Sequence, residues 1–166
     1  MVWETLFWGV TLTTKSEGHS LGVHLDPALT METQVSSVIR SAHFHFQQIV
    51  QLRPFLEVGE LTTLVHALVV SRLNYCNVLY VGLSLRLTRK LQMVQNGVSS
   101  LLTGVKRYQH IFPTLAALHW LPIHFHADFK VLTITYKALK SLGPQYLAER
   151  LLPSSSTRDT HSSQAG

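Results

Sequence analysis

Several residue types that would narrow the function of this chain are scarce in it. Its 166 residues include a single cysteine, Cys76, so no internal disulfide can form and nothing argues for secretion. Only nine residues are acidic, and the three aspartates, Asp26, Asp128 and Asp159, lie far apart in the sequence. We therefore do not expect chemistry that needs two neighbouring carboxylates to hold two divalent cations.

The sequence also lacks a recognisable metal or hydrolase motif. Ten histidines are present, and two pairs are spaced two residues apart, His43 with His45 and His124 with His126. On a helix this spacing turns the imidazoles about 200° apart, so they cannot share one ion. No Cys-x-x-Cys or His-Glu-x-x-His motif occurs. We expect no metal site, no cofactor, no catalytic residue, no nucleophile elbow and no small-molecule substrate.

Long apolar runs are missing too. The apolar stretch over residues 61–81 is interrupted by His66, Arg72 and Asn74, so it does not predict a membrane span. The apolar residues 5–12 follow Glu4, where a signal peptide would have basic residues. The expectation is an intracellular protein without membrane contact, in the cytoplasm or the nucleus.

What the chain does contain is a large apolar fraction and an uneven charge. Hydrophobic residues make up 46% of it, which is enough for the core of one domain. The net charge is +5, and residues 85–150 hold nine basic and two acidic side chains. Such a basic half suits a polyanionic partner, above all a phosphate backbone. A soluble basic surface without a specific partner explains the charge equally well.

Apolar residues recur at helical spacing over most of the chain, which predicts an all-α fold of five to six packed helices. These helices are expected over residues 30–51, 57–72, 84–102, 114–119, 122–139 and 145–152. Ser84 suits an N-cap and Gly104 the position after a helix end. A short extended segment, 21–25, should precede the helices and end at the turn Asp26-Pro27.

The helix expected over residues 122–139 has its own apolar stripe, through which it should pack. The stripe consists of Phe125, Phe129, Leu132, Tyr136 and Leu139.

Three regions follow along the chain. Residues 1–20 form a leader without recognisable pattern, and 21–152 form the helical domain. The Ser/Thr-rich residues 153–166 are expected to be a disordered tail.

Five short phrases carry a resemblance to a known family. They are 71–77 (Ser-Arg-Leu-Asn-Tyr-Cys-Asn), 91–96 (Leu-Gln-Met-Val-Gln-Asn), 118–122 (Leu-His-Trp-Leu-Pro), 128–130 (Asp-Phe-Lys) and 135–139 (Thr-Tyr-Lys-Ala-Leu). In this order and spacing they resemble the C-terminal part of LINE-type (non-LTR retrotransposon) reverse transcriptases. The resemblance spans roughly residues 21–152 and covers the thumb and the segment after it. The palm, which holds the catalytic carboxylates, is not part of it.

The resemblance implies a catalytically inert fragment whose thumb-like helices grip a nucleic-acid backbone. Carried over by position, that role falls on Arg86, Arg89, Lys90, Lys106 and Arg107. In two places the chain departs from the family pattern. Ser100 stands in place of an arginine, and His124 and His126 follow the Leu-Pro pair where arginines are usual. Both changes weaken phosphate binding at neutral pH, as expected of a decayed element copy behind a new start.

Helical geometry adds three basic residues to this set. Lys130 and Lys137 share one flank of their helix with His126, and Lys140 lies nearby. If the helices pack side by side, all eight basic residues could form one track for RNA or DNA. A solvated polar face explains each group taken singly.

The sequence therefore predicts weak, sequence-independent nucleic-acid binding at most, and no enzyme. Two alternatives remain open. The chain could be a protein-interaction module that uses exposed apolar helix faces, or a translated relic without a selected function.

Overall fold

The computed structural model describes residues 4–7, 10–13, 18–105 and 110–151. In this part of the chain the fold is mostly α-helical, which confirms the predicted class. The chain divides into two compact units, Met1–Asp128 and Phe129–Gly166, and each is described by itself. The predicted tail, residues 153–166, lies outside the described residues.

Two antiparallel hairpins precede the helices. β1 (Glu4–Phe7) pairs with β2 (Val10–Thr13), and β3 (Gly18–Ser20) pairs with β4 (Val23–Leu25). Of the extended segment predicted over residues 21–25, β4 confirms residues 23–25, whereas residues 21 and 22 form the hairpin turn. The strands of residues 4–20 were not predicted, because runs of three or four residues are too short to show a clear alternation.

The turn at Asp26-Pro27 leads into the first long helix. The carboxylate of Asp26 accepts hydrogen bonds from the backbone N–H groups of Thr30 and Met31, both at 2.9 Å, and from the Thr30 hydroxyl at 3.0 Å. The backbone hydrogen bond from Thr30 is the main reason that the pKa of Asp26 is lowered. Asp26 thus fixes the turn that starts the helical part.

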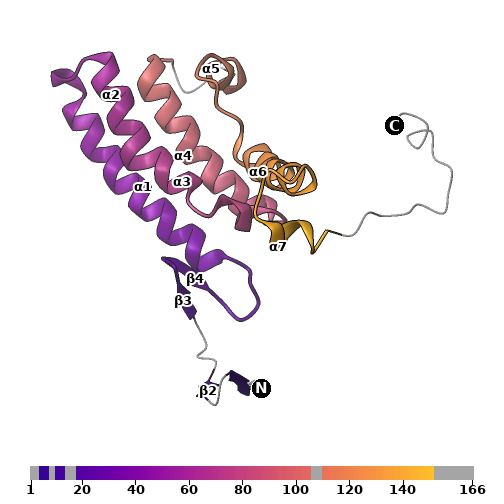
Figure 1. Ribbon diagram of the computed structural model, residues 1–166. Helices are drawn as coiled ribbons and strands as arrows, with labels where there is room; N and C mark the ends of the chain where they lie inside the picture. The colour runs from indigo at the N-terminus through magenta and orange to yellow at the C-terminus, as the bar shows by residue number, and fades with distance from the viewer. Residues whose placement is uncertain (1–3, 8–9, 14–17, 106–109, 152–166) are drawn as a thin grey trace. The chain divides into compact units, whose positions relative to one another are not determined.

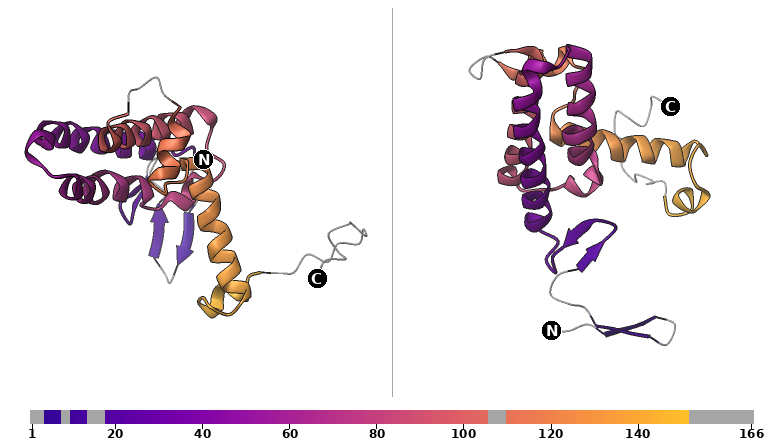
Figure 2. Two further views of the ribbon diagram at one scale, coloured as in Figure 1. Left: turned by 90° about the horizontal axis from the view of Figure 1, so that it is seen from above. Right: turned by 90° about the vertical axis from the view of Figure 1, so that its left-hand side faces the viewer.

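Three helical rods form the body of the first unit (Figure 1). They are α1 (Glu32–Leu52), the continuous run α2 (Val58–Val65), η2 (His66–Val70) and α3 (Ser71–Asn74), and α4 (Leu85–Thr103). Figures 1 and 2 show them side by side, and α1 contacts both other rods. The predicted helix 57–72 is therefore present, with one π-helical turn in its middle.

Shorter elements connect and follow the rods. These are the 3₁₀ turns η1 (Arg53–Phe55) and η3 (Asn77–Tyr80), and the helices α5 (Ile111–Ala117), α6 (Ile123–Leu139) and α7 (Gln145–Ala148). Gly104 ends α4 with a φ of 70°, the left-handed conformation that suits glycine. Ser84 occupies the N-cap position of α4, but its side chain makes no capping hydrogen bond.

The core lies between the three rods and is built from the predicted apolar stripes. Val35, Ala42 and Ile49 of α1 are no more than 1% exposed. The opposing buried residues are Val65, Val69, Leu73, Leu87, Leu91, Val94 and Val98. The helical periodicity of the sequence therefore identified the packed faces of these rods correctly.

The expected packing of the α6 stripe is wrong. Its five residues, Phe125, Phe129, Leu132, Tyr136 and Leu139, are between 52% and 67% exposed. The buried residues of α6 are instead Ile123, Ala127 and Ala138, which lie on another side of the helix. Periodicity reveals that a helix has an apolar face, but it does not reveal whether anything covers that face.

Candidate functional site

A basic cluster lies at the start of α4 and consists of Arg86, Arg89 and Lys90, all of which are exposed. Arg86 Nη1 lies 3.9 Å from Glu32 Oε1, and both side chains are largely exposed. A pair this long and this exposed contributes little. Within the described residues, Arg89 and Lys90 form no salt bridge. The cluster therefore keeps most of its positive charge available to an anion.

The backbone at the same helix end adds to this positive field. The first turn of α4 contains no acidic side chain, and the Ser84 side chain does not cap it. The first N–H groups of a helix lack partners inside the helix and carry a partial positive charge. Three cations in the first two turns thus lie near the unpaired amide groups of the helix end, which is an arrangement that attracts phosphate oxygens.

The other predicted basic residues divide into two groups. Lys106 and Arg107 lie outside the described residues. Lys130, Lys137 and Lys140 are exposed and belong to the second unit, where the helical path of α6 puts Lys130 and Lys137 on one flank. The structure brings Arg86, Arg89 and Lys90 together on α4. The single track through all eight residues stays a prediction.

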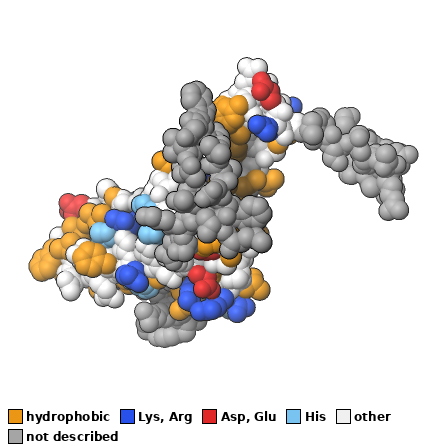
Figure 3. Space-filling model, turned by 90° about the horizontal axis from the view of Figure 1, so that it is seen from below, with side chains coloured by type: hydrophobic (Ala, Val, Ile, Leu, Met, Phe, Trp, Pro, Cys, Tyr) orange, Lys and Arg blue, Asp and Glu red, His pale blue; other side chains and the backbone are white. Residues whose placement is uncertain are grey.

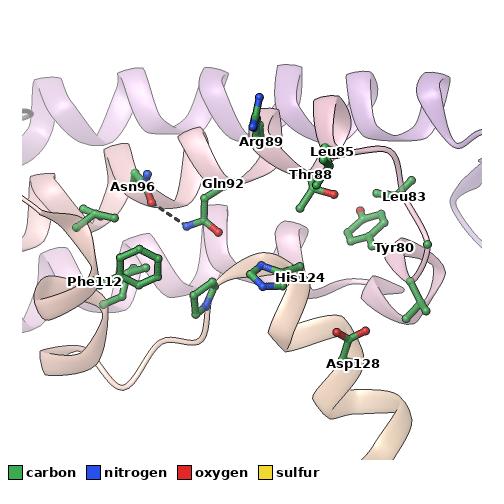
Figure 4. A pocket seen from close by; sticks show the side chains of 15 residues that line it. Tyr80, Leu83, Leu85, Thr88, Arg89, Gln92, Asn96, Phe112, His124 and Asp128 are labelled. Atoms are coloured by element: carbon green, nitrogen blue, oxygen red, sulfur yellow. Dashed lines mark hydrogen bonds between the residues drawn. The ribbon is translucent and has the colours of Figure 1, made fainter.

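A pocket of about 460 Å³ adjoins the basic cluster within the first unit (Figure 4). Its walls come from η3 and the loop after it, from α4 and α5, and from the first turns of α6, and Arg89 is one of the lining residues. Most of the wall is apolar, with Leu83, Phe112 and Leu115 among its side chains. The sequence did not predict this pocket, because its residues span positions 80–128 and meet only in the folded chain.

Polar side chains of α4 hold one wall of the pocket in place. Gln92 donates from Nε2 to Gln95 Oε1 and Asn96 Oδ1, both at 2.8 Å, and its Oε1 accepts from the Ile123 N–H at 2.9 Å. Gln95, which is 6% exposed, donates to the Leu121 carbonyl at 2.9 Å. Phrase 91–96 therefore holds the backbone at the end of phrase 118–122 and at the residue after it, and this gives the two phrases a physical reason to occur together.

Tyr80 is the least satisfied polar residue of the pocket wall. Its side chain is 5% exposed, and its hydroxyl has no hydrogen-bond partner among the described residues. Burial raises the pKa of Tyr80 to about 12, with a smaller effect from Cys76, so the phenol stays protonated at neutral pH. The pocket wall thus holds a buried O–H donor that is left unpaired at a cost in free energy.

Other candidate groups have structural roles. Trp120 is half-buried against the core and meets the His66 ring edge-on, with 5.4 Å between the ring centroids, so it is not free to stack on a base. Residues 18–22 have the spacing Gly-x-Ser-x-Gly of a hydrolase elbow, so the expectation that no hydrolase motif occurs in the sequence is wrong. They form a hairpin turn rather than a strand-to-helix turn, so no elbow is present. In the described ranges, no three His, Cys, Asp or Glu side chains are grouped as metal ligands would be.

Figure 3 shows one face of the molecule, on which hydrophobic side chains lie at the surface among separate Lys and Arg side chains. No described helix combines the length and the apolar character needed to cross a membrane.

Comparisons with models of protein families, with curated proteins and with solved structures find no match for this chain. The resemblance to a reverse transcriptase thumb therefore stays a prediction.

Proposed function

We propose that this chain is a non-catalytic module that binds the phosphate backbone of RNA or DNA without sequence preference. The observation that carries the proposal is the basic cluster Arg86, Arg89 and Lys90 on the uncapped first turns of α4. Cations in this position and the partial charges of the helix end act on the same anion. The wide separation of the three aspartates in the sequence supports a binding role rather than polymerisation.

Weak, salt-dependent binding follows from the size of the cluster. Each neutralised phosphate contributes about −0.7 to −0.9 to the slope of log K against log salt. Three contacts give a slope of roughly −2 to −3, so affinity should fall about 15- to 60-fold between 50 and 200 mM salt. The expected Kd at physiological salt is micromolar or weaker, as is usual for non-specific contacts.

The proposal is tested by fluorescence anisotropy with a labelled single strand of about 20 nucleotides, titrated at several salt concentrations. The test variant carries Arg86→Gln, Arg89→Gln and Lys90→Gln. The matched control carries Arg40→Gln, Arg53→Gln and Arg72→Gln, three exposed cations elsewhere in the first unit. Both triple variants lose three positive charges, so they differ only in where the charge is removed.

The test variant should lose most of the affinity and most of the salt slope, while the control keeps both. Equal losses in the two variants would mean that only net charge matters, and the proposed site would then be wrong. If the wild-type chain does not bind the labelled strand at 50 mM salt, the proposed function is wrong.

A second candidate function is favoured by the exposed apolar face of α6, defined by Phe125, Phe129, Leu132, Tyr136 and Leu139. Large side chains each bring up to roughly 150–250 Å² of surface, so this face exposes on the order of 500 Å². This is the size of the largest apolar patch on a typical monomer, and such a patch often has a function, such as binding a partner protein. In sedimentation velocity, Phe129→Ser with Leu132→Ser should abolish concentration-dependent association, and unchanged association would exclude this face.

A further inference from the structure

The pocket beside the basic cluster has the size and shape of a binding site. Its volume of about 460 Å³ lies within the usual range for ligand sites. Arg89 belongs both to the basic cluster and to the lining of the pocket. A phosphate held by Arg89 would therefore lie at the edge of a mostly apolar cavity. The chemical group joined to that phosphate could then reach the interior of the pocket.

Rings are prominent among the lining residues. Phe112 is 65% exposed, and the rings of Tyr80 and His124 also line the cavity (Figure 4). Leu83 and Leu115 supply aliphatic surface between them. A flat, weakly polar ring system fits such walls, because aromatic faces stack on it and aliphatic groups contact its plane.

The polar groups of the lining favour a ring that both donates and accepts hydrogen bonds. Asn96 uses its Oδ1 to accept from Gln92, which leaves its N–H groups as donors. Thr88 donates its hydroxyl to the Ser84 carbonyl, so its Oγ1 can still accept a hydrogen bond. The Tyr80 hydroxyl is buried behind the wall, and Figure 4 shows it directed towards α4. The α4 side of the pocket therefore offers both a donor and an acceptor, as the polar edge of a nucleobase requires.

We propose that this pocket takes one unpaired nucleobase of a bound single strand, with an adjacent phosphate on Arg89. The inference rests on the proposed function and adds a preference to it. A paired base would first have to leave its stack, which costs free energy. Single strands should therefore bind better than duplexes of the same length. Asp128, on the α6 side of the lining, repels phosphate there and favours the backbone on the Arg89 side.

A purely aliphatic ligand is less well matched to this lining, because it would leave the N–H groups of Asn96 without a partner in the pocket.

The test compares three labelled ligands by anisotropy at 50 mM salt: a 12-nucleotide oligouridylate, a 12-unit strand with the same phosphates but no bases, and a 12-base-pair duplex. The wild-type chain should bind oligouridylate roughly tenfold more tightly than the abasic strand, as expected for one stacked base. Phe112→Ala should reduce this ratio severalfold and leave the abasic affinity unchanged. The matched control Phe44→Ala, an exposed ring on α1, should change neither value.

The two proposals fail in different ways. If oligouridylate and the abasic strand bind equally well and both depend on salt, the pocket inference is overturned while backbone binding stands. If no strand binds, the proposed function fails. A titration with uridine monophosphate, followed by NMR, then decides the pocket separately. Saturable shifts at the Tyr80 and Phe112 rings would support it, and unshifted rings would overturn it.

Discussion

Replacing Leu91 by alanine tests the packing that positions the basic cluster. Leu91 is 0% exposed and belongs to the buried stripe of α4, the helix that carries Arg86, Arg89 and Lys90. Truncation at a fully buried leucine removes its transfer free energy and leaves a cavity, together about 3–4 kcal/mol. Domains have about 5–15 kcal/mol of stability in total, so this loss is a large share.

Thermal and urea unfolding, followed by circular dichroism, measure the effect. At about 3 °C per kcal/mol for a chain of this length, the Tm should fall by about 10 °C. Met93→Ala is the matched control, because Met93 lies on the same helix and is 71% exposed. Its effect should stay within about 0.5 kcal/mol. Equal effects of the two substitutions, or a loss below about 1 kcal/mol for Leu91→Ala, would refute the described packing of α4.

The remaining predictions concern single residues outside the core. Gly104→Ala should lower the free energy of unfolding by about 1 kcal/mol, because φ is 70° at this position. Gly59→Ala should raise it by about 0.5–1 kcal/mol, because Gly59 lies on an open helix surface. Urea unfolding measures both changes. The pKa of Asp26 in the folded chain lies below its ordinary value. The ionised Asp26 carboxylate therefore stabilises the fold fully above the unfolded pKa of about 3.9, and this contribution is lost as the pH falls through the folded pKa. Asp26→Asn should therefore reduce the drop in Tm between pH 5 and pH 3, and an unchanged drop would contradict this role. Glu32→Gln should tighten strand binding in the anisotropy assay, because it removes the anion beside Arg86; weaker binding would speak against the cluster.

The rods of the fold could be predicted because their apolar stripes are long and regular. Over α1 and α4, buried residues such as Val35, Ala42, Leu91 and Val98 recur at helical spacing. The same rule failed for α6, where Phe129 and its neighbours form an equally regular stripe that stays exposed. A stripe reflects the chemistry of one helix, whereas burial depends on what lies against it.

The candidate site was predictable in part, for a similar reason. Arg86, Arg89 and Lys90 lie within two turns of one helix, so helical geometry alone brings them together. The pocket needs Tyr80, Phe112 and residues of α6 to meet through tertiary contacts that no local pattern encodes. One signal was present in phrase 91–96, where two glutamines and an asparagine lie beside the apolar stripe of the helix.

The resemblance to a reverse transcriptase thumb concerns the order of short sequence phrases, whereas the structure concerns the exposure and the contacts of their residues. The resemblance named five basic residues by position, and the structure describes three of them as one exposed cluster. The contacts of phrase 91–96 with the backbone of Leu121 and Ile123, at the end of phrase 118–122, give the pattern a physical basis in this chain, namely amide side chains that hold a backbone segment.

The most direct test of the central claim is a ¹⁵N–¹H correlation spectrum of the full chain, titrated with a single strand at low salt. If the start of α4 binds phosphate, the amide signals of residues 85–90 should shift first and furthest, and added salt should reverse the shifts. Shifts confined to the amides of α6, or no shift at residues 85–90 while the strand binds, would contradict the account.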